Sequence, residues 1–107
     1  MRRQPPKKTA ETRKIEKLLL EHFPDHPRGY PPSAYRYNPA SIRVRVVSPR
    51  FAGKTRGQRA DMVYPILKDN LPEDLWLDIM IVLLLTPEEV EDSMGNYEFK
   101  HPAPSPV

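Results

Sequence analysis

The stretch Phe51-Ala-Gly-Lys-Thr-Arg-Gly-Gln-Arg-Ala-Asp-Met-Val-Tyr64 decides the fold of this 107-residue chain. A strand pattern precedes it, because Ile42-Arg-Val-Arg-Val46 alternates apolar and charged residues with a period of two. A helical pattern overlaps its end, since apolar residues recur at helical spacing from Met62 to Leu71. The stretch therefore predicts a basic, glycine-containing loop that leads from a strand into a helix.

One helix and one further strand are expected before this stretch. Thr9 is a suitable N-cap, an apolar stripe runs from Ile15 to Phe23, and Pro24 ends the element. Residues Ser33 to Tyr37 predict a short strand, and Asn38-Pro-Ala-Ser41 supplies turn residues after it.

After the stretch, the run Leu75 to Leu85 is nearly all apolar, so it fits either a buried strand or a buried helix. Its isoleucines and valine favour a strand. Thr86-Pro-Glu-Glu89 predicts a helix start, and the helix is expected to reach about Met94. Pro65 lies inside the preceding helical pattern, where it either occupies the first turn or kinks the helix.

These elements predict a single small α+β domain with the order α-β-β-α-β-α. We expect a three-stranded mixed sheet with helices packed on one face, because the arginines of the second strand need an uncovered face. The domain is predicted to span residues 9–95. Residues 1–8 are expected to form a disordered basic tail, and residues 96–107 a Pro-rich C-terminal tail.

Composition limits the function classes. The formal charge of +3 and the pI near 9.3 permit contact with nucleic acid or an acidic partner without requiring either. The absence of cysteine excludes disulfides, thiolate nucleophiles and cysteine-ligated metals in this chain. No signal peptide pattern is visible, and the longest apolar run is too short to span a bilayer. We therefore expect a soluble, cytoplasmic protein that does not bind a membrane.

Two motifs resemble the BolA family. The stretch Phe51–Tyr64 matches the family signature F-x-G-x(5)-R-H-R-x-V-Y without a gap, through Phe51, Gly53, Arg59 and Met62-Val-Tyr64. The segments Leu77-Asp-Ile-Met80 and Thr86-Pro-Glu88 are similar to its V-H-A-L strand start and its T-P-E ending. The resemblance covers roughly residues 10–92, and it implies a small α+β fold related to the type II KH arrangement.

The chain departs from the family at its signature histidines. Ala60 and Asp61 replace the last two residues of R-H-R, and Asp78 replaces the histidine of the last strand. In the family, one of these histidines is associated with an iron–sulfur cluster shared with a monothiol glutaredoxin. Alanine has no donor atom, and aspartate is a hard oxygen donor poorly suited to such a cluster. We therefore expect no metal and no cofactor.

A group of basic side chains is the main candidate site. The loop before the second helix would add its backbone N–H groups and the helix dipole to these side chains, favouring an anionic partner. The alternative is a solvated cationic face balanced by nearby carboxylates. The basic residues are Arg43, Arg45, Arg50, Lys54, Arg56 and Arg59, and the balancing carboxylates are Asp61, Asp69, Glu73 and Asp74.

Two smaller groups have simpler interpretations. His22, Asp25 and His26 include two possible metal ligands, but Pro24 interrupts helical spacing, so solvent-exposed residues at a helix end are expected. Asp78 is expected to stay in water at a strand end. If Asp78 were buried, it would need a cationic partner such as Arg59 or Lys54.

Aromatic residues before the second strand offer a further candidate. Tyr30, Tyr35 and Tyr37, together with Arg36, would stack on and neutralise a single strand of nucleic acid. The simpler alternative is a β-hairpin whose tyrosines are half-buried with their hydroxyls in water, and we favour it.

Together these patterns predict a non-catalytic protein, since no nucleophile–base pair, phosphate loop, zinc spacing or paired carboxylates are found. The leading hypothesis is a BolA-like regulatory or adaptor domain that binds nucleic acid through the basic strand–loop–helix surface. The second hypothesis is a protein–protein interaction module. In that case the same surface docks an acidic or glutaredoxin-like partner without iron–sulfur ligation.

Overall fold

The computed structural model describes residues 8–93, so the predicted tails over residues 1–7 and 96–107 lie outside the described residues. No helix within residues 8–93 has the length and apolar character needed to cross a membrane. The elements, in chain order, are helix α1 (Ala10–His22), strands β1 (Ser33–Asn38) and β2 (Ser41–Val47), 3-10 turn η1 (Pro49–Phe51), helices α2 (Arg56–Asn70) and α3 (Glu73–Asp78), strand β3 (Ile79–Leu85) and 3-10 turn η2 (Pro87–Glu89).

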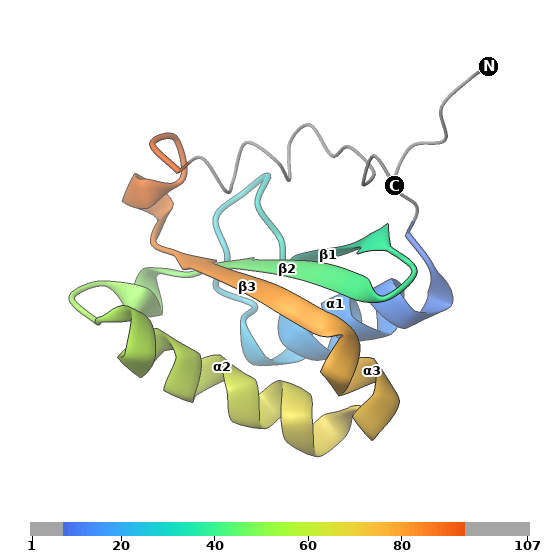
Figure 1. The fold of residues 1–107 in the computed structure, drawn as a ribbon. Helices are drawn as coiled ribbons and strands as arrows, with labels where there is room; N and C mark the ends of the chain where they lie inside the picture. Colours follow the sequence, from blue (N-terminus) through green and yellow to red (C-terminus); the bar gives the residue numbers. More distant parts are fainter. Residues whose placement is uncertain (1–7, 94–107) are drawn as a thin grey trace.

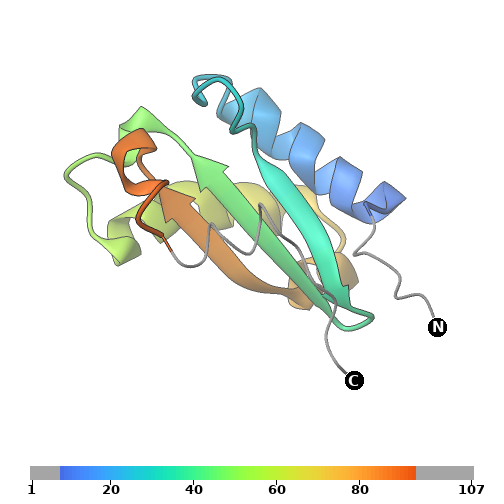
Figure 2. The same cartoon turned by 90° about the horizontal axis from the view of Figure 1, so that it is seen from above.

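The three strands form one mixed sheet in the order β1-β2-β3. Strand β1 is antiparallel to β2, and β2 is parallel to β3. All three helices lie on one face of this sheet (Figure 1), and the view in Figure 2 looks onto the opposite face. The predicted α+β class, with a three-stranded mixed sheet, is confirmed.

The alternation of β2 separates the two faces of the sheet. Ile42, Val44 and Val46 are fully buried and pack in the main core with residues of the helices. Arg43 and Arg45 therefore point to the face without helices, as expected from a period of two. The helices contribute the buried residues Ile15, Leu19, Phe23, Val63, Leu67 and Leu75 to the same core.

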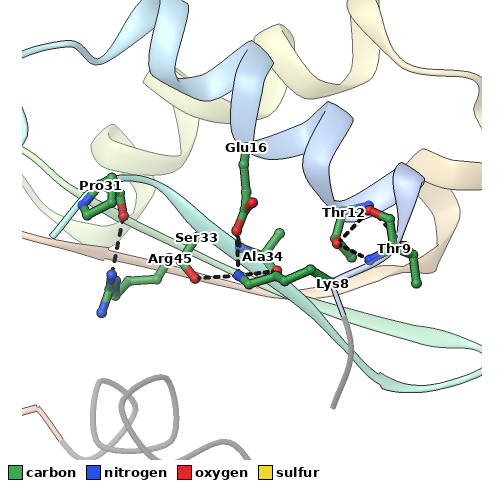
Figure 3. Close-up of polar contacts among 8 residues, drawn as sticks. All are labelled: Lys8, Thr9, Thr12, Glu16, Pro31, Ser33, Ala34 and Arg45. Carbon is green, nitrogen blue, oxygen red and sulfur yellow. Dashed lines mark hydrogen bonds and ion pairs between the residues drawn. The ribbon is translucent and has the colours of Figure 1, made fainter. Parts of the chain in front are cut away.

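Helix α1 begins where the sequence predicts it. The hydroxyl of Thr9 accepts a hydrogen bond from the backbone N–H of Thr12 at 3.1 Å. The Thr12 hydroxyl accepts one from the N–H of Thr9 at 2.8 Å, which completes a reciprocal cap (Figure 3). Lys8, which was assigned to the disordered tail, instead contacts β1 through its ammonium group, donating to the carbonyl of Ala34 at 2.7 Å.

Helix α2 starts earlier than its apolar pattern. Thr55 caps it, because its hydroxyl accepts from the N–H of Gln58 at 3.2 Å. Pro65 consequently lies inside the helix, so of its two predicted placements the one in the first turn is excluded. Pro65 has no N–H to give to the carbonyl of Asp61, but both residues are exposed, so that carbonyl can bind water.

The apolar run after α2 is not one strand. Its first residues belong to the short helix α3, which starts after Pro72 with Glu73 and Asp74 in its first turn, and only Ile79–Leu85 forms β3. Carboxylates favour a helix start there through the helix dipole. The helix predicted to reach Met94 is also wrong, since between Thr86 and Ser93, where the description ends, the chain makes only the single turn η2.

The packing of α2 against the sheet gives a stability prediction. Leu67 is fully buried in the main core, whereas Leu20 on α1 is 44% exposed. Leu67→Ala should lower the free energy of unfolding by about 2–5 kcal/mol, because it leaves a cavity in the core. Leu20→Ala, measured by the same denaturant titration, should change it by about 0.5 kcal/mol or less. Equal losses in the two variants would contradict this packing.

Candidate functional site

The six predicted basic residues do not form one surface. They occupy three separate places in the structure. Arg43 and Arg45 lie on the sheet face without helices, Arg50 lies in η1, and Lys54, Arg56 and Arg59 surround the start of α2.

The two sheet arginines are engaged with tyrosines. The guanidinium of Arg43 lies 3.8 Å from the ring centre of Tyr37, and that of Arg45 lies 5.4 Å from the ring centre of Tyr30. Arg45 also donates to the carbonyl of Pro31 at 3.2 Å (Figure 3) and is only 6% exposed. Burial lowers the pKa of the Arg45 guanidinium below its ordinary value. A side chain this buried is a poor contact for a nucleic-acid backbone.

Arg50 joins η1 to the end of α1. Its guanidinium donates to both carboxylate oxygens of Asp25 at 3.1 Å and lies 4.4 Å from the ring centre of Phe23. The hydrogen bond from Arg50 lowers the pKa of the Asp25 carboxyl below its ordinary value. Asp25 also accepts from the Ser48 hydroxyl at 2.9 Å. Arg50 thus forms an intramolecular ion pair with Asp25.

Arg59, a residue of the first motif, bonds to residues on both sides of Thr86-Pro-Glu88, which belongs to the second motif. Its guanidinium donates to the two carboxylate oxygens of Glu89 at 2.7 and 3.2 Å, a bidentate pair. It also donates to the carbonyl of Leu84 in β3 and to that of Lys54, each at 3.0 Å. Arg59 is therefore a structural bridge between α2, β3 and η2, not an exposed contact for a partner.

The hydrogen bonds from Arg59 change the acidity of Glu89. Together with the backbone N–H of Thr86, they lower the pKa of the Glu89 carboxyl to about 2. The same carboxylate accepts from Thr86 N–H at 2.8 Å and so caps η2. Sequence reasoning treated this glutamate only as part of a helix start. The Thr-Pro-Glu-Glu pattern was the signal, but the pairing with Arg59 required the fold.

Of the six predicted basic residues, Arg50, Lys54 and Arg56 are exposed, and Arg50 is held in its ion pair with Asp25. Gly53 adopts a φ of 73°, in the left-handed region, and the N–H of Lys54 bonds to the carbonyl of Phe51 at 3.2 Å. This tight turn carries the chain from η1 to the cap of α2 and leaves the side chains of Lys54 and Arg56 beside the C-terminal end of β3.

These two side chains stand at the edge of a cleft of about 540 Å³ between α2 and β3. One wall is the face of α2 formed by Arg56, Ala60 and Tyr64, and the other is the backbone and side chains of residues 81–85. The remaining lining residues are Lys54, Arg59, Glu89 and Ser93. Since Glu89 is neutralised by Arg59, the charge that the cleft presents is positive. We call it the α2–β3 groove.

The residues at the family's histidine positions do not fit an iron–sulfur cluster. Ala60 lines the α2–β3 groove but has no donor atom. The Asp78 carboxylate is held by Arg36, which donates to it at 3.0 Å, so neither Arg59 nor Lys54 is its partner. Asp78 is the last residue of α3, whereas the sequence predicted that it would lie at the end of a strand. Within residues 8–93, no group of three potential ligands of the His, Cys, Asp and Glu types comes together.

The tyrosine group is divided by the alternation of β1. Tyr35 pairs across the sheet with Arg43, and Arg36 pairs with Ile42 and so faces the helices. There the Arg36 guanidinium donates to Glu11 at 2.7 Å in addition to Asp78, and its hydrogen bond to Glu11 contributes most to raising the pKa of Arg36. Arg36 therefore does not interleave with the tyrosines.

A scan against models of known protein families and a search of curated proteins both found no match to this chain.

The Arg59–Glu89 pair predicts a specific acid sensitivity. Because the folded state lowers the Glu89 pKa from 4.5 to about 2, the pair stabilises the fold fully above pH 4.5 and loses this effect as the pH falls toward 2. Glu89→Gln keeps the cap but removes the charge. It should lower stability at neutral pH and make the decline between these pH values shallower, as measured by denaturant titration across pH.

The neighbouring Glu88, which is exposed, provides the matched control. Glu88→Gln should leave the shape of the pH profile of stability unchanged, because it removes a charge of the same sign outside the bidentate pair. The interpretation of Glu89 would be wrong if both variants flattened the profile equally.

Proposed function

We propose that this chain is a non-catalytic, BolA-like adaptor domain that binds an acidic protein partner at the α2–β3 groove. The observation that carries the proposal is the position of Lys54 and Arg56, two exposed cations that line a cleft together with the apolar residues 81–85 of β3. A cleft that combines apolar side chains with positive charge is compatible with docking of an acidic protein.

The BolA-like part of the proposal is supported by the chain order and by the motifs. Two residues of the first motif, Arg59 and Tyr64, lie at this groove together with Glu89, which directly follows the Thr86-Pro-Glu88 segment of the second. The resemblance implied a small α+β domain related to the type II KH arrangement, and the α-β-β-α-α-β order is compatible with it. A glutaredoxin-like protein is the partner that the resemblance suggests. Binding would rest on shape and charge, since Ala60 supplies no ligand for a shared cluster.

Nucleic-acid binding is the second candidate, and one observation favours it. Lys54 and Arg56 flank Thr55, the N-cap of α2, so two cations and the positive end of a helix dipole lie together. Against it, the other four predicted basic residues are bound to tyrosines, carboxylates or backbone carbonyls. Two exposed cations make a small electrostatic footprint for a phosphate backbone.

A charge-reversal experiment tests the docking surface. The double variant Lys54→Glu, Arg56→Glu should weaken binding of an apo monothiol glutaredoxin by about tenfold or more, measured by calorimetric titration. Lys14→Glu, Lys17→Glu reverses two exposed lysines on α1 and is the matched control, for which affinity should stay nearly unchanged. An affinity insensitive to the first variant would show that the groove is not the docking surface.

The same proteins distinguish the second candidate. Titration with a mixed-sequence single-stranded oligonucleotide at low salt should show at most weak binding if the groove is a protein-docking site. Tight binding with a steep dependence on salt, lost in the Lys54→Glu, Arg56→Glu variant, would instead establish nucleic acid as the ligand.

A further inference from the structure

The described chain ends beside the sheet face without helices, which we call the open face. After β3, the turn η2 brings the chain back so that the buried Val90 packs with Val47 and Leu85. Val47 lies on the open face, because it follows Arg45 by two residues in β2, and Leu85 is its partner in β3. The residues after β3 therefore turn onto the open face.

A hydrogen bond holds this return of the chain in place. The hydroxyl of Tyr30, in the loop before β1, donates to the carboxylate of Glu91 at 3.2 Å. Ser93, the last described residue, lines the α2–β3 groove at the same end of the sheet. The chain that follows Ser93 therefore starts where the open face meets the groove, and it has two routes, over the face or along the groove.

The burial of side chains distinguishes the two routes. Tyr35 lies on the open face, because it pairs across the sheet with Arg43, yet it is only 3% exposed. At the groove, Tyr64 is 42% exposed and Ile81 45%. The burial of Tyr35 indicates a cover over β1 and β2, and the exposure of Tyr64 and Ile81 indicates that the groove is left open.

Among residues 8–93, no helix or turn lies over the middle of the open face (Figure 2). In that view η2 and the loop before β1 cross the face only at the end where β2 and β3 finish. A side chain on an uncovered sheet face keeps part of its surface in water. The burial of Tyr35 therefore points to a cover from outside the described residues.

Residues 94–107 have a composition suited to this cover. Tyr97 and Phe99 stand on either side of Glu98, so they offer large apolar surfaces together with a carboxylate for the arginines of the open face. Lys100 balances the charge of Glu98, so burial of the aromatic rings is the main attraction. The prolines after residue 101 lack an N–H and favour an extended chain, which leaves few backbone donors to be paired.

The opposite end of the chain does not suit the open face. Residues 1–7 contain no aromatic side chain and no carboxylate, and their charged residues are Arg2, Arg3 and Lys7. The open face already carries Arg43 and Arg45, and like charges brought together repel.

The segment is also long enough. Fully extended, residues 94–107 span up to about 46 Å, twice the length of about 23 Å that the seven residues of β2 cover. The segment can therefore start at Ser93 and cross the whole open face.

We propose that residues 94–107 run back over the open face as a strap, with Tyr97 and Phe99 packed over Tyr35. The strap covers the tyrosines and arginines of β1 and β2, so a ligand reaches them only when the strap is displaced. It goes beyond the proposed docking function and does not use Lys54 or Arg56. Failure of the strap therefore leaves the docking proposal standing, and a failed docking test leaves the strap standing.

A spin label on the full chain tests the strap. The chain contains no cysteine, so Ala103→Cys accepts a single nitroxide label, which broadens the NMR signals of nearby amides. The amide signals of Tyr37 and Arg43 should be lost and should return when the nitroxide is reduced. The signal of Lys17, on the exposed side of α1, should persist. Loss confined to α2 would place the segment in the groove, and equal weak broadening everywhere would show no fixed position; either result would overturn the proposal.

Two double substitutions in the labelled chain provide the matched comparison. Tyr97→Ser, Phe99→Ser should restore the amide signals of β1 and β2, because it removes the apolar contacts of the strap. Pro104→Ser, Pro106→Ser keeps both rings and should leave these signals lost. Equal recovery in the two variants would contradict the proposal.

A mixture of two preparations shows whether the strap covers its own chain. One preparation is isotopically labelled without the nitroxide, and the other carries the nitroxide without the isotope. The amide signals of β1 and β2 should persist in the mixture. Their loss would mean that the segment lies on a second copy, which would overturn the proposal.

Discussion

Arg59 fixes the corner of the molecule on which the remaining surface depends. One guanidinium binds the Glu89 carboxylate in a bidentate pair and also bonds to the carbonyls of Leu84 and Lys54. It is 13% exposed, so these bonds are shielded from solvent more than those of an ordinary surface pair. The corner holds the start of α2 against the end of β3 and sets the position of the α2–β3 groove. Arg59, which the sequence suggested as a binding contact, instead holds together the elements that border the α2–β3 groove.

The two edges of the sheet differ in how far side chains cover their backbone groups. Helices cover one face, and the β1 edge is closed by Lys8 and Glu16. The β3 edge has exposed apolar side chains, and Lys54 and Arg56 lie beside its C-terminal end. An open edge of this composition is compatible with the acidic partner proposed for the α2–β3 groove.

Local patterns were sufficient for most of the fold. The cap at Thr9 and the alternation in β2 depend on neighbours a few residues away, so they were readable in the sequence. The apolar run before Thr86 was predicted as one strand, whereas its first residues belong to α3, because a buried helix and a buried strand have the same composition. The carboxylates after Pro72 were the available signal that a helix comes first. The final helix was also predicted wrongly: the cap formed by Thr86 and Glu89 is present, but it starts the single turn η2.

The sequence by itself determined the class of fold and the mixed sheet, since each depends on residue type or local spacing. Only the tertiary structure decided which charges are available. Arg43, Arg45, Arg50 and Arg59 find aromatic rings, carboxylates or carbonyls on other elements, and these pairings depend on how the elements pack. Lys54 and Arg56 remain exposed, and their place beside the β3 edge makes that edge the candidate site.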